Sequence, residues 1–136
     1  MAFRSKLEVR FGAIDHAGIV YYPRFLHYFH VALEEFFGVE LGIDYPTVTN
    51  THRFGLSTVH LETDFSRSLR YGDVIEVEVR VLKIGRTSIT FGYKTFREGE
   101  TEPHNFGHNV VVCLDMDTFQ KTGIPSWLRD RLGVLS

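Results

Sequence analysis

The stretch FGAIDHAGIVYYPRF, residues 11–25, contains a single acid, Asp15, shortly before a predicted helix. A carboxylate can act as a general base or as a nucleophile at an electrophilic carbon. The N–H groups in the first turn of a helix lack partners within the helix and carry partial positive charge, so they stabilise negative charge nearby. An isolated aspartate before a helix is more often a turn or capping residue. Asp15 is therefore either a structural turn residue or a catalytic carboxylate beside a group of N–H donors.

The histidines raise the question of a metal or a second base. His27 and His30 are three residues apart in the predicted helix, and His104 and His108 lie near the last predicted strand. No cysteine or carboxylate stands at a recognised zinc spacing from either pair, so we predict no metal site. His16 is next to Asp15, but adjacent loop residues usually point apart, which makes a His-Asp pair the weaker interpretation.

Composition limits the classes of protein and partner. The chain has 136 residues, of which 43% are hydrophobic, enough for one domain, residues 1–136, with a core. A net charge of -2, from 15 basic and 17 acidic residues, gives no broad positive field, so we expect no nucleic-acid and no membrane partner. The single Cys113 cannot form an internal disulfide, and the start MAFRSKLEVRF lacks the apolar run of a signal peptide. These features favour a cytoplasmic protein.

Two elements must position Asp15. Residues 6–11 alternate between apolar and polar side chains, with Leu7, Val9 and Phe11 on one face, which predicts a half-buried strand. Pro23 suits the first position of a helix, and Gly38 suits its end. Between them, apolar residues recur every three or four positions: Phe25, Phe29, Ala32, Leu33 and Phe36.

The rest of the chain is predicted to be mostly sheet. Residues 38–55 form an irregular surface segment. Strands are predicted at 57–66, 74–82, 88–96 and 109–117, with a tight hairpin at 83–87 and a short helix at 125–132. A single antiparallel sheet has one face to cover, and the long helix has the apolar stripe to cover it. Apolar exposed sheet edges favour pairing with a second copy of the chain.

The run from Asp15 to Pro23 matches Asp-x-x-Gly-[IV]-[VI]-[FY]-Tyr-Pro, placed between first strand and long helix. With the order of elements and the stretch SRSLRYGDVIEVEVRVLKIGRTSITF, it resembles the hotdog-fold acyl-CoA thioesterases of the 4-hydroxybenzoyl-CoA thioesterase type. The resemblance implies an α+β hotdog fold, in which a five-stranded antiparallel sheet wraps one long helix and a short C-terminal helix follows. It also implies a homodimer, often paired into a homotetramer, with active sites between subunits.

The resemblance further implies how the chain acts. Asp15 would attack the thioester carbonyl or activate a water, and the backbone N–H of Tyr22 would polarise the carbonyl oxygen. Gly18 would let the loop approach the substrate or adopt a positive φ. The products are a free acid, aromatic or short-chain, and coenzyme A, with no cofactor beyond the coenzyme A of the substrate.

Substrate contacts are predicted at two places. The hairpin offers basic and hydroxyl side chains for coenzyme A phosphates, and tyrosine and phenylalanine near Asp15 offer rings for the acyl group. These residues are Lys83, Arg86, Thr87 and Ser88 in the hairpin and Tyr21 and Phe25 near Asp15. A basic hairpin can also merely protect a sheet edge, and the rings can be core residues. Two other functions are open: a thioesterase for acyl carrier protein, and a non-catalytic module that binds acyl-CoA.

Overall fold

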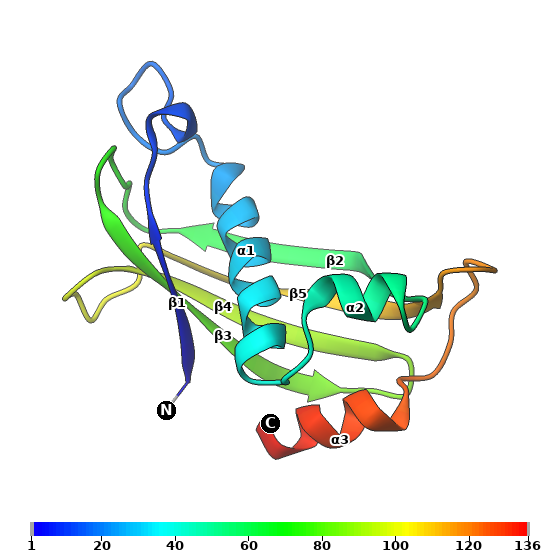
Figure 1. Cartoon of the computed structure of the whole chain (residues 1–136). Coiled ribbons are helices and arrows are strands. Elements are labelled where there is room, and N and C mark those ends of the chain that lie inside the picture. Colours follow the sequence, from blue (N-terminus) through cyan, green and yellow to red (C-terminus); the bar gives the residue numbers. More distant parts are fainter. Residues whose placement is uncertain (1, 136) are drawn as a thin grey trace.

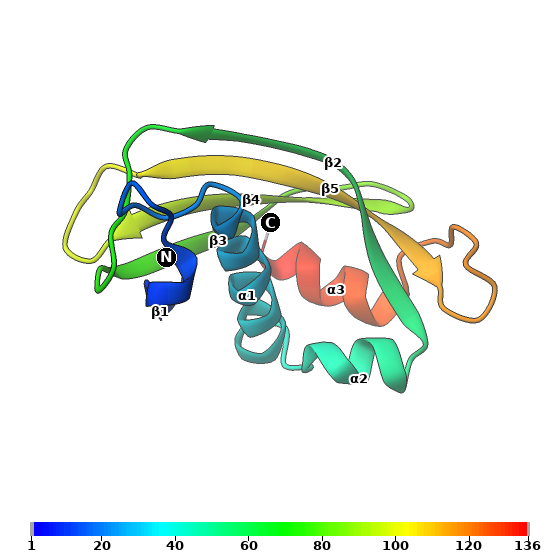
Figure 2. The ribbon, with the colours of Figure 1, turned by 90° about the horizontal axis from the view of Figure 1, so that it is seen from above.

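A computed structural model describes residues 2–135, in which five strands form one antiparallel sheet and the helices lie on one of its faces (Figures 1 and 2). The strands are β1 (Phe3–Glu8), β2 (Phe54–Phe65), β3 (Val74–Ile84), β4 (Ser88–Arg97) and β5 (Asn105–Asp115). The helices are α1 (Arg24–Val39), α2 (Tyr45–Asn50) and α3 (Ser126–Leu135), and a short 3₁₀ helix covers Phe11–Ala13. The predicted hotdog arrangement is confirmed.

The strands lie in the order β1-β3-β4-β5-β2. Strands β3, β4 and β5 form the predicted meander, whereas β1 and β2, which come first in the chain, form the two edges. Phe3 lies opposite Val79 at one edge, and Phe54 lies opposite Asp115 at the other. The segment that contains α1 therefore connects one edge of the sheet to the other.

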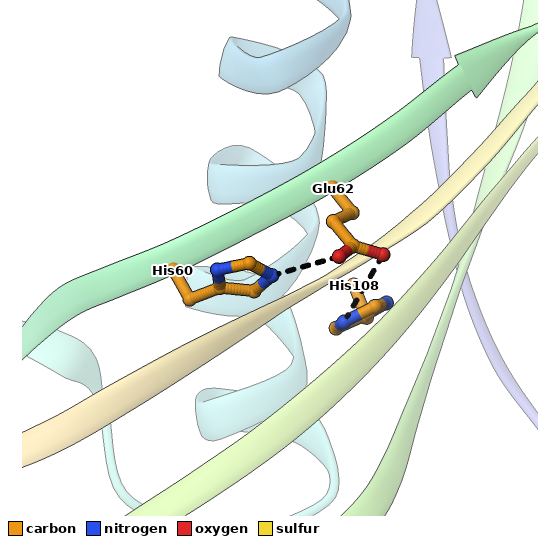
Figure 3. A group of neighbouring side chains, drawn as sticks. All are labelled: His60, Glu62 and His108. Atoms are coloured by element: carbon orange, nitrogen blue, oxygen red, sulfur yellow. Dashed lines mark hydrogen bonds and ion pairs between the residues drawn. The ribbon is translucent and has the colours of Figure 1, made fainter.

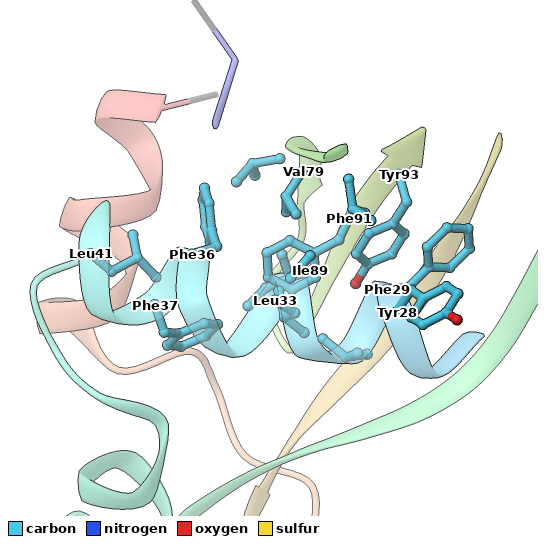
Figure 4. Close-up of a cluster of buried hydrophobic side chains, with 14 of the residues drawn as sticks. Tyr28, Phe29, Leu33, Phe36, Phe37, Leu41, Val79, Ile89, Phe91 and Tyr93 are labelled. Carbon is cyan, nitrogen blue, oxygen red and sulfur yellow. The ribbon is translucent and has the colours of Figure 1, made fainter. Parts of the chain in front are cut away.

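The apolar stripe of α1 makes the core against the sheet, as predicted (Figure 4). All five residues of the predicted stripe are buried. Phe29 stacks on Tyr93 with ring centroids 4.5 Å apart, and Phe36 meets Phe91 edge to face at 6.2 Å. Because each buried aromatic side chain removes a large apolar area from water, this stripe fixes α1 on the concave face of the sheet.

Several predicted boundaries were wrong. The first strand spans Phe3–Glu8, not residues 6–11, and Phe11 is 74% exposed because the chain turns there into the 3₁₀ helix. Helix α1 continues through Gly38 to Val39. The segment 38–55 contains α2, which has a proline in its first turn, where no N–H is needed for an intrahelical bond.

Strand β2 is an edge strand with a bulge. Thr58 lies opposite Val111 and His60 opposite Val110, so Val59 is the extra residue. The apolar side chains Val59, Leu61 and Phe65 remain 41–60% exposed. Among residues 2–135, no helix has both the length and the apolar composition needed to cross a bilayer.

Candidate active site

The loop that carries Asp15 is closed by backbone hydrogen bonds. Ile14 and Val20 form an isolated antiparallel bridge, and the Asp15 N–H donates to the carbonyl of Ile19 at 2.9 Å. The Gly18 N–H donates to the Asp15 carbonyl at 3.0 Å, and Gly18 has a φ of +80°. A residue with a Cβ is strained in that conformation, so the turn that holds Asp15 depends on glycine at this position.

The Asp15 side chain has one oxygen bound within the loop. Its Oδ1 accepts the N–H of Ala17 at 2.8 Å, which is the Asx-turn role expected of an aspartate in a loop. No hydrogen bond within residues 2–135 uses its Oδ2. The exposed carboxylate lines an open pocket together with His16, Tyr21 and Arg24. The structural and the catalytic roles of Asp15 are therefore compatible, because they use different oxygens.

The chain just before α1 offers one unpaired backbone donor. The N–H of Tyr21 is bound by the carbonyl of Ala13 at 2.9 Å, which ties this segment to the base of the Asp15 loop. The N–H of Arg24 donates to Tyr21 at 2.8 Å, and Pro23 has no N–H. No hydrogen bond among the described residues uses the N–H of Tyr22, which leaves it available to an external acceptor.

Aromatic side chains surround this donor. The ring of Tyr22 lies 5.4 Å from that of Tyr21 and 6.2 Å from that of Phe65, and all three side chains are substantially exposed. Phe25 is only 3% exposed and packs edge to face on Phe65 and Tyr28. Tyr21 thus lies at the Asp15 pocket as expected, whereas Phe25 is a core residue in this chain.

The structure does not bring the basic hairpin to Asp15 within one chain. The Asp15 loop contacts the sheet where β3 begins, through a bridge between Ile19 and Arg70. Lys83 and Arg86, both exposed, lie at the other end of β3. Eleven residues of extended chain separate the two ends by roughly 33 Å. These hairpin residues cannot contact a small acyl group held at Asp15 of the same chain.

The hairpin itself is anchored by the C-terminal part of the chain. Arg129 of α3 donates to the carbonyl of Gly85 at 2.6 Å, and the carbonyl of Thr87 accepts the N–H of Cys113 at 2.9 Å. Thr87 and Ser88 are half-buried. The backbone of the hairpin is therefore held in place, while the exposed basic side chains project into solvent.

Two other candidate groups, the thiol of Cys113 and the imidazole of His104, are buried inside the fold. Cys113 is fully buried, and burial raises the pKa of its thiol to about 12, so it stays protonated and is a poor nucleophile. His104 is also buried; its Nε2 lies 2.6 Å from Glu100 and its Nδ1 lies 3.1 Å from the carbonyl of Ser68.

Arg24 lines the Asp15 pocket but was not predicted from the sequence as a site residue. Its position directly after Pro23, in the first turn of the helix, was a usable signal.

The fold agrees with comparisons to known proteins. A family model described as the thioesterase-like superfamily matches residues 9–132. The chain belongs to this superfamily. Within it, a 1,4-dihydroxy-2-naphthoyl-CoA hydrolase from Synechococcus elongatus is 29% identical over 133 residues, which cover 97% of this chain and 96% of the relative. The predicted resemblance to hotdog acyl-CoA thioesterases is confirmed.

Solved structures of other proteins have the same fold. A 1,4-dihydroxy-2-naphthoyl-CoA thioesterase from Synechocystis superposes with a TM-score of 0.87 at 20% identity, covering 98% of this chain and 96% of the other. A gentisyl-coenzyme A thioesterase superposes with a TM-score of 0.82 at 24% identity, covering 96% of this chain and 99% of the other. At these identities the superpositions establish the fold, and the prediction of a thioester hydrolase is supported by the named sequence relative.

Proposed function

We propose that this superfamily member is an acyl-CoA thioesterase that hydrolyses an aromatic acyl-CoA, with hydroxylated aromatic acyl groups as the first class to test. The proposal is carried by two groups in one loop and the helix start that follows it: the exposed Asp15 carboxylate, whose Oδ2 no hydrogen bond among the described residues uses, and the N–H of Tyr22, which also has no partner among them. The exposed rings of Tyr21 and Tyr22 suit a flat acyl group. The nearly full-length relative named as a 1,4-dihydroxy-2-naphthoyl-CoA hydrolase supports the same substrate class.

The reaction follows from these two groups. In one route the Asp15 carboxylate attacks the thioester carbon, the C–S bond breaks, and water hydrolyses the resulting mixed anhydride. In the other route Asp15 removes a proton from water, which attacks the same carbon. In both, negative charge grows on the carbonyl oxygen, where the Tyr22 N–H donates a hydrogen bond. Coenzyme A leaves as the thiol after protonation, and no further cofactor is needed.

The predicted second copy completes the site in this proposal. The edge strand β2 is exposed, and an antiparallel pairing of two β2 strands about a twofold axis reverses the direction of the partner sheet. That reversal puts the hairpin of one copy at the end of the molecule where Asp15 of the other copy lies. Lys83 and Arg86 could then meet coenzyme A phosphates across the interface. Pairing of dimers into a tetramer, like a cytoplasmic location, stays a prediction.

The direct test is thiol release from a panel of benzoyl-, hydroxybenzoyl-, dihydroxynaphthoyl-, short-chain and long-chain acyl-CoAs, compared between wild type and Asp15→Asn. Asparagine keeps an Oδ1 that can accept the Ala17 N–H, so the loop should fold. It cannot act as a base or carboxylate nucleophile, so kcat should fall at least about 100-fold. Asp130→Asn, at an exposed aspartate on α3, is the matched control and should remain active.

Other results would point elsewhere. Wild-type turnover by Asp15→Asn would refute the proposed role of Asp15 as base or nucleophile. Thiol release from acyl carrier protein esters alone would identify the carrier-protein enzyme, and tight acyl-CoA binding without release would identify a binding module.

A further inference from the structure

Three side chains on two neighbouring strands converge on the outer face of the sheet (Figure 3). His60 and Glu62 are two residues apart on β2, and His108 on β5 lies directly opposite Glu62. His60 Nε2 is 3.0 Å from Glu62 Oε1, and His108 Nε2 is 3.9 Å from Glu62 Oε2. One ligand atom from each of the three residues lies within 4.8 Å of the other two.

We propose that His60, Glu62 and His108 form a binding site for a divalent transition-metal cation of the zinc class. Two imidazoles and one carboxylate are a donor set that Zn²⁺ uses in proteins. In a tetrahedral site with bonds of about 2.1 Å, the ligand atoms are about 3.4 Å apart. His60 Nε2 lies 3.0 Å from one Glu62 oxygen, and His108 Nε2 lies 3.9 Å from the other. Side-chain rotations would bring both imidazoles and one carboxylate oxygen to a common cation, because one ligand atom of each residue already lies within 4.8 Å of the other two.

The sheet fixes the positions of the three ligands. The extra residue Val59 shifts by one position the alternation of side chains between the two faces of the sheet. From His60 onward, every second side chain of β2 therefore points away from α1. Leu61 and Asn109, the neighbours of the ligands, line the pocket beneath α1 on the opposite face. Glycine at position 107 permits the close pairing beside the site, because a Cβ there would lie 2.3 Å from the carbonyl oxygen of Glu62. The two strands therefore approach closely where the ligands meet.

The groove beside the cluster leaves a coordination position open. Glu62 and His108 border this surface groove of about 340 Å³, which two carboxylates and two cationic side chains also line: Asp64, Glu78, Arg80 and Lys94. Because Glu78 is ion-paired with Arg80, the charge of the groove is mixed, and the three ligands themselves would hold the cation. Three protein ligands leave a fourth position for water from the groove. Because Asp15 precedes α1 on the other face of the sheet, the metal site is independent of the proposed hydrolysis and would act by fastening the edge strand β2 to β5.

Calorimetric titration with Zn²⁺ at pH 7.5, with Co²⁺ absorption as a second readout, tests the proposal on the metal-free full chain. The wild type should bind one Zn²⁺ per chain and give the intense visible bands of tetrahedral Co²⁺. His108→Gln should weaken Zn²⁺ binding at least about tenfold and abolish those bands. His27→Gln, which removes an exposed histidine of α1, is the control and should bind as wild type does. Zn²⁺ should also raise the melting temperature of the wild type but not of His108→Gln.

The proposal is overturned if His108→Gln binds Zn²⁺ as tightly as wild type, or if His27→Gln loses as much affinity. Glu62→Gln gives the same test at an exposed position if His108→Gln does not fold. Wild-type protein that binds no Zn²⁺ would also overturn it. Thiol release measured on the same samples separates this result from the hydrolase proposal, since a metal-free enzyme should remain active.

Discussion

Replacing the peptide N–H of Tyr22 by an ester oxygen isolates the proposed oxyanion donor. The substitution uses the α-hydroxy analogue of tyrosine and keeps the phenol ring. No hydrogen bond among residues 2–135 uses this N–H, so its removal breaks no contact in the folded chain. The ester weakens only the Tyr21 carbonyl, which accepts the N–H of Arg24 at 2.8 Å. The free energy of unfolding should therefore fall by less than about 1 kcal/mol.

The effect on catalysis should be much larger. A single preorganised oxyanion donor contributes about 3 kcal/mol to transition-state stabilisation, which corresponds to a fall in kcat of about 100-fold. KM should change little, because the bond strengthens mainly as charge develops on the carbonyl oxygen. The assay is thiol release from the best acyl-CoA of the panel, with urea unfolding of the same sample.

The matched control is the same change at Thr122, outside the Asp15 loop, whose N–H donates to the carbonyl of Cys113 at 2.9 Å. Cys113 is buried, so the ester leaves a buried carbonyl without its donor and should destabilise the fold by about 1–3 kcal/mol. Its kcat should stay within a few-fold of wild type at temperatures where it is folded. A Tyr22 ester that retains wild-type kcat would refute the oxyanion role. So would equal losses of kcat in both variants.

Two further changes test the loop and an ion-pair cluster. In Gly18→Ala the new Cβ would meet no atom within 4 Å, but the alanine would have to keep a φ of +80°. The change should therefore lower the free energy of unfolding by about 1–2 kcal/mol, and an unchanged urea midpoint would show that the loop relaxes. Hydrogen bonds from His104 and Arg97 lower the pKa of Glu100 to about 2 in the folded chain. Ionised Glu100 therefore stabilises the fold at pH values above its unfolded pKa near 4.5, and this stabilisation is lost as the pH falls toward 2. Glu100→Gln should therefore be less stable than wild type at pH 7, and the difference in urea midpoint should shrink between pH 4.5 and 2. A difference that is constant over this range would contradict the assignment.

Local patterns predicted the elements well where burial is one-sided. The stripe of α1 is periodic because one face of the helix meets the sheet, and the β3-β4-β5 meander joins strands by short turns. The boundary near Phe11 could not be predicted, because the alternation continues past the point where β1 loses its partner. The short helix α2 lies within the segment 38–55 that was predicted to be irregular, because its Pro46 is typical of loops, although the first helical turn tolerates proline.

The candidate site was predictable only as far as it is local. Asp15, Gly18 and Tyr22 lie within eight residues, and their hydrogen bonds are those of one loop and one helix start. The separation of Asp15 from Arg86 depends on the length and direction of β3, which residue types do not encode. The His60, Glu62 and His108 cluster depends on the register of β2 with β5, so no spacing in the sequence indicates it.

The strand order has a consequence for synthesis on the ribosome. Synthesis begins at the N-terminus, so β1 is made before β3, the strand with which it pairs. Likewise β2 is made before its partner strand β5. When residues up to Phe65 have emerged, the aromatic stripe of α1 has no completed sheet to cover. Pairing of residues far apart in sequence is slow to form, and exposed apolar surface promotes association in the meantime. The N-terminal half, which contains Asp15, therefore exposes apolar side chains that favour association until β5 has been made.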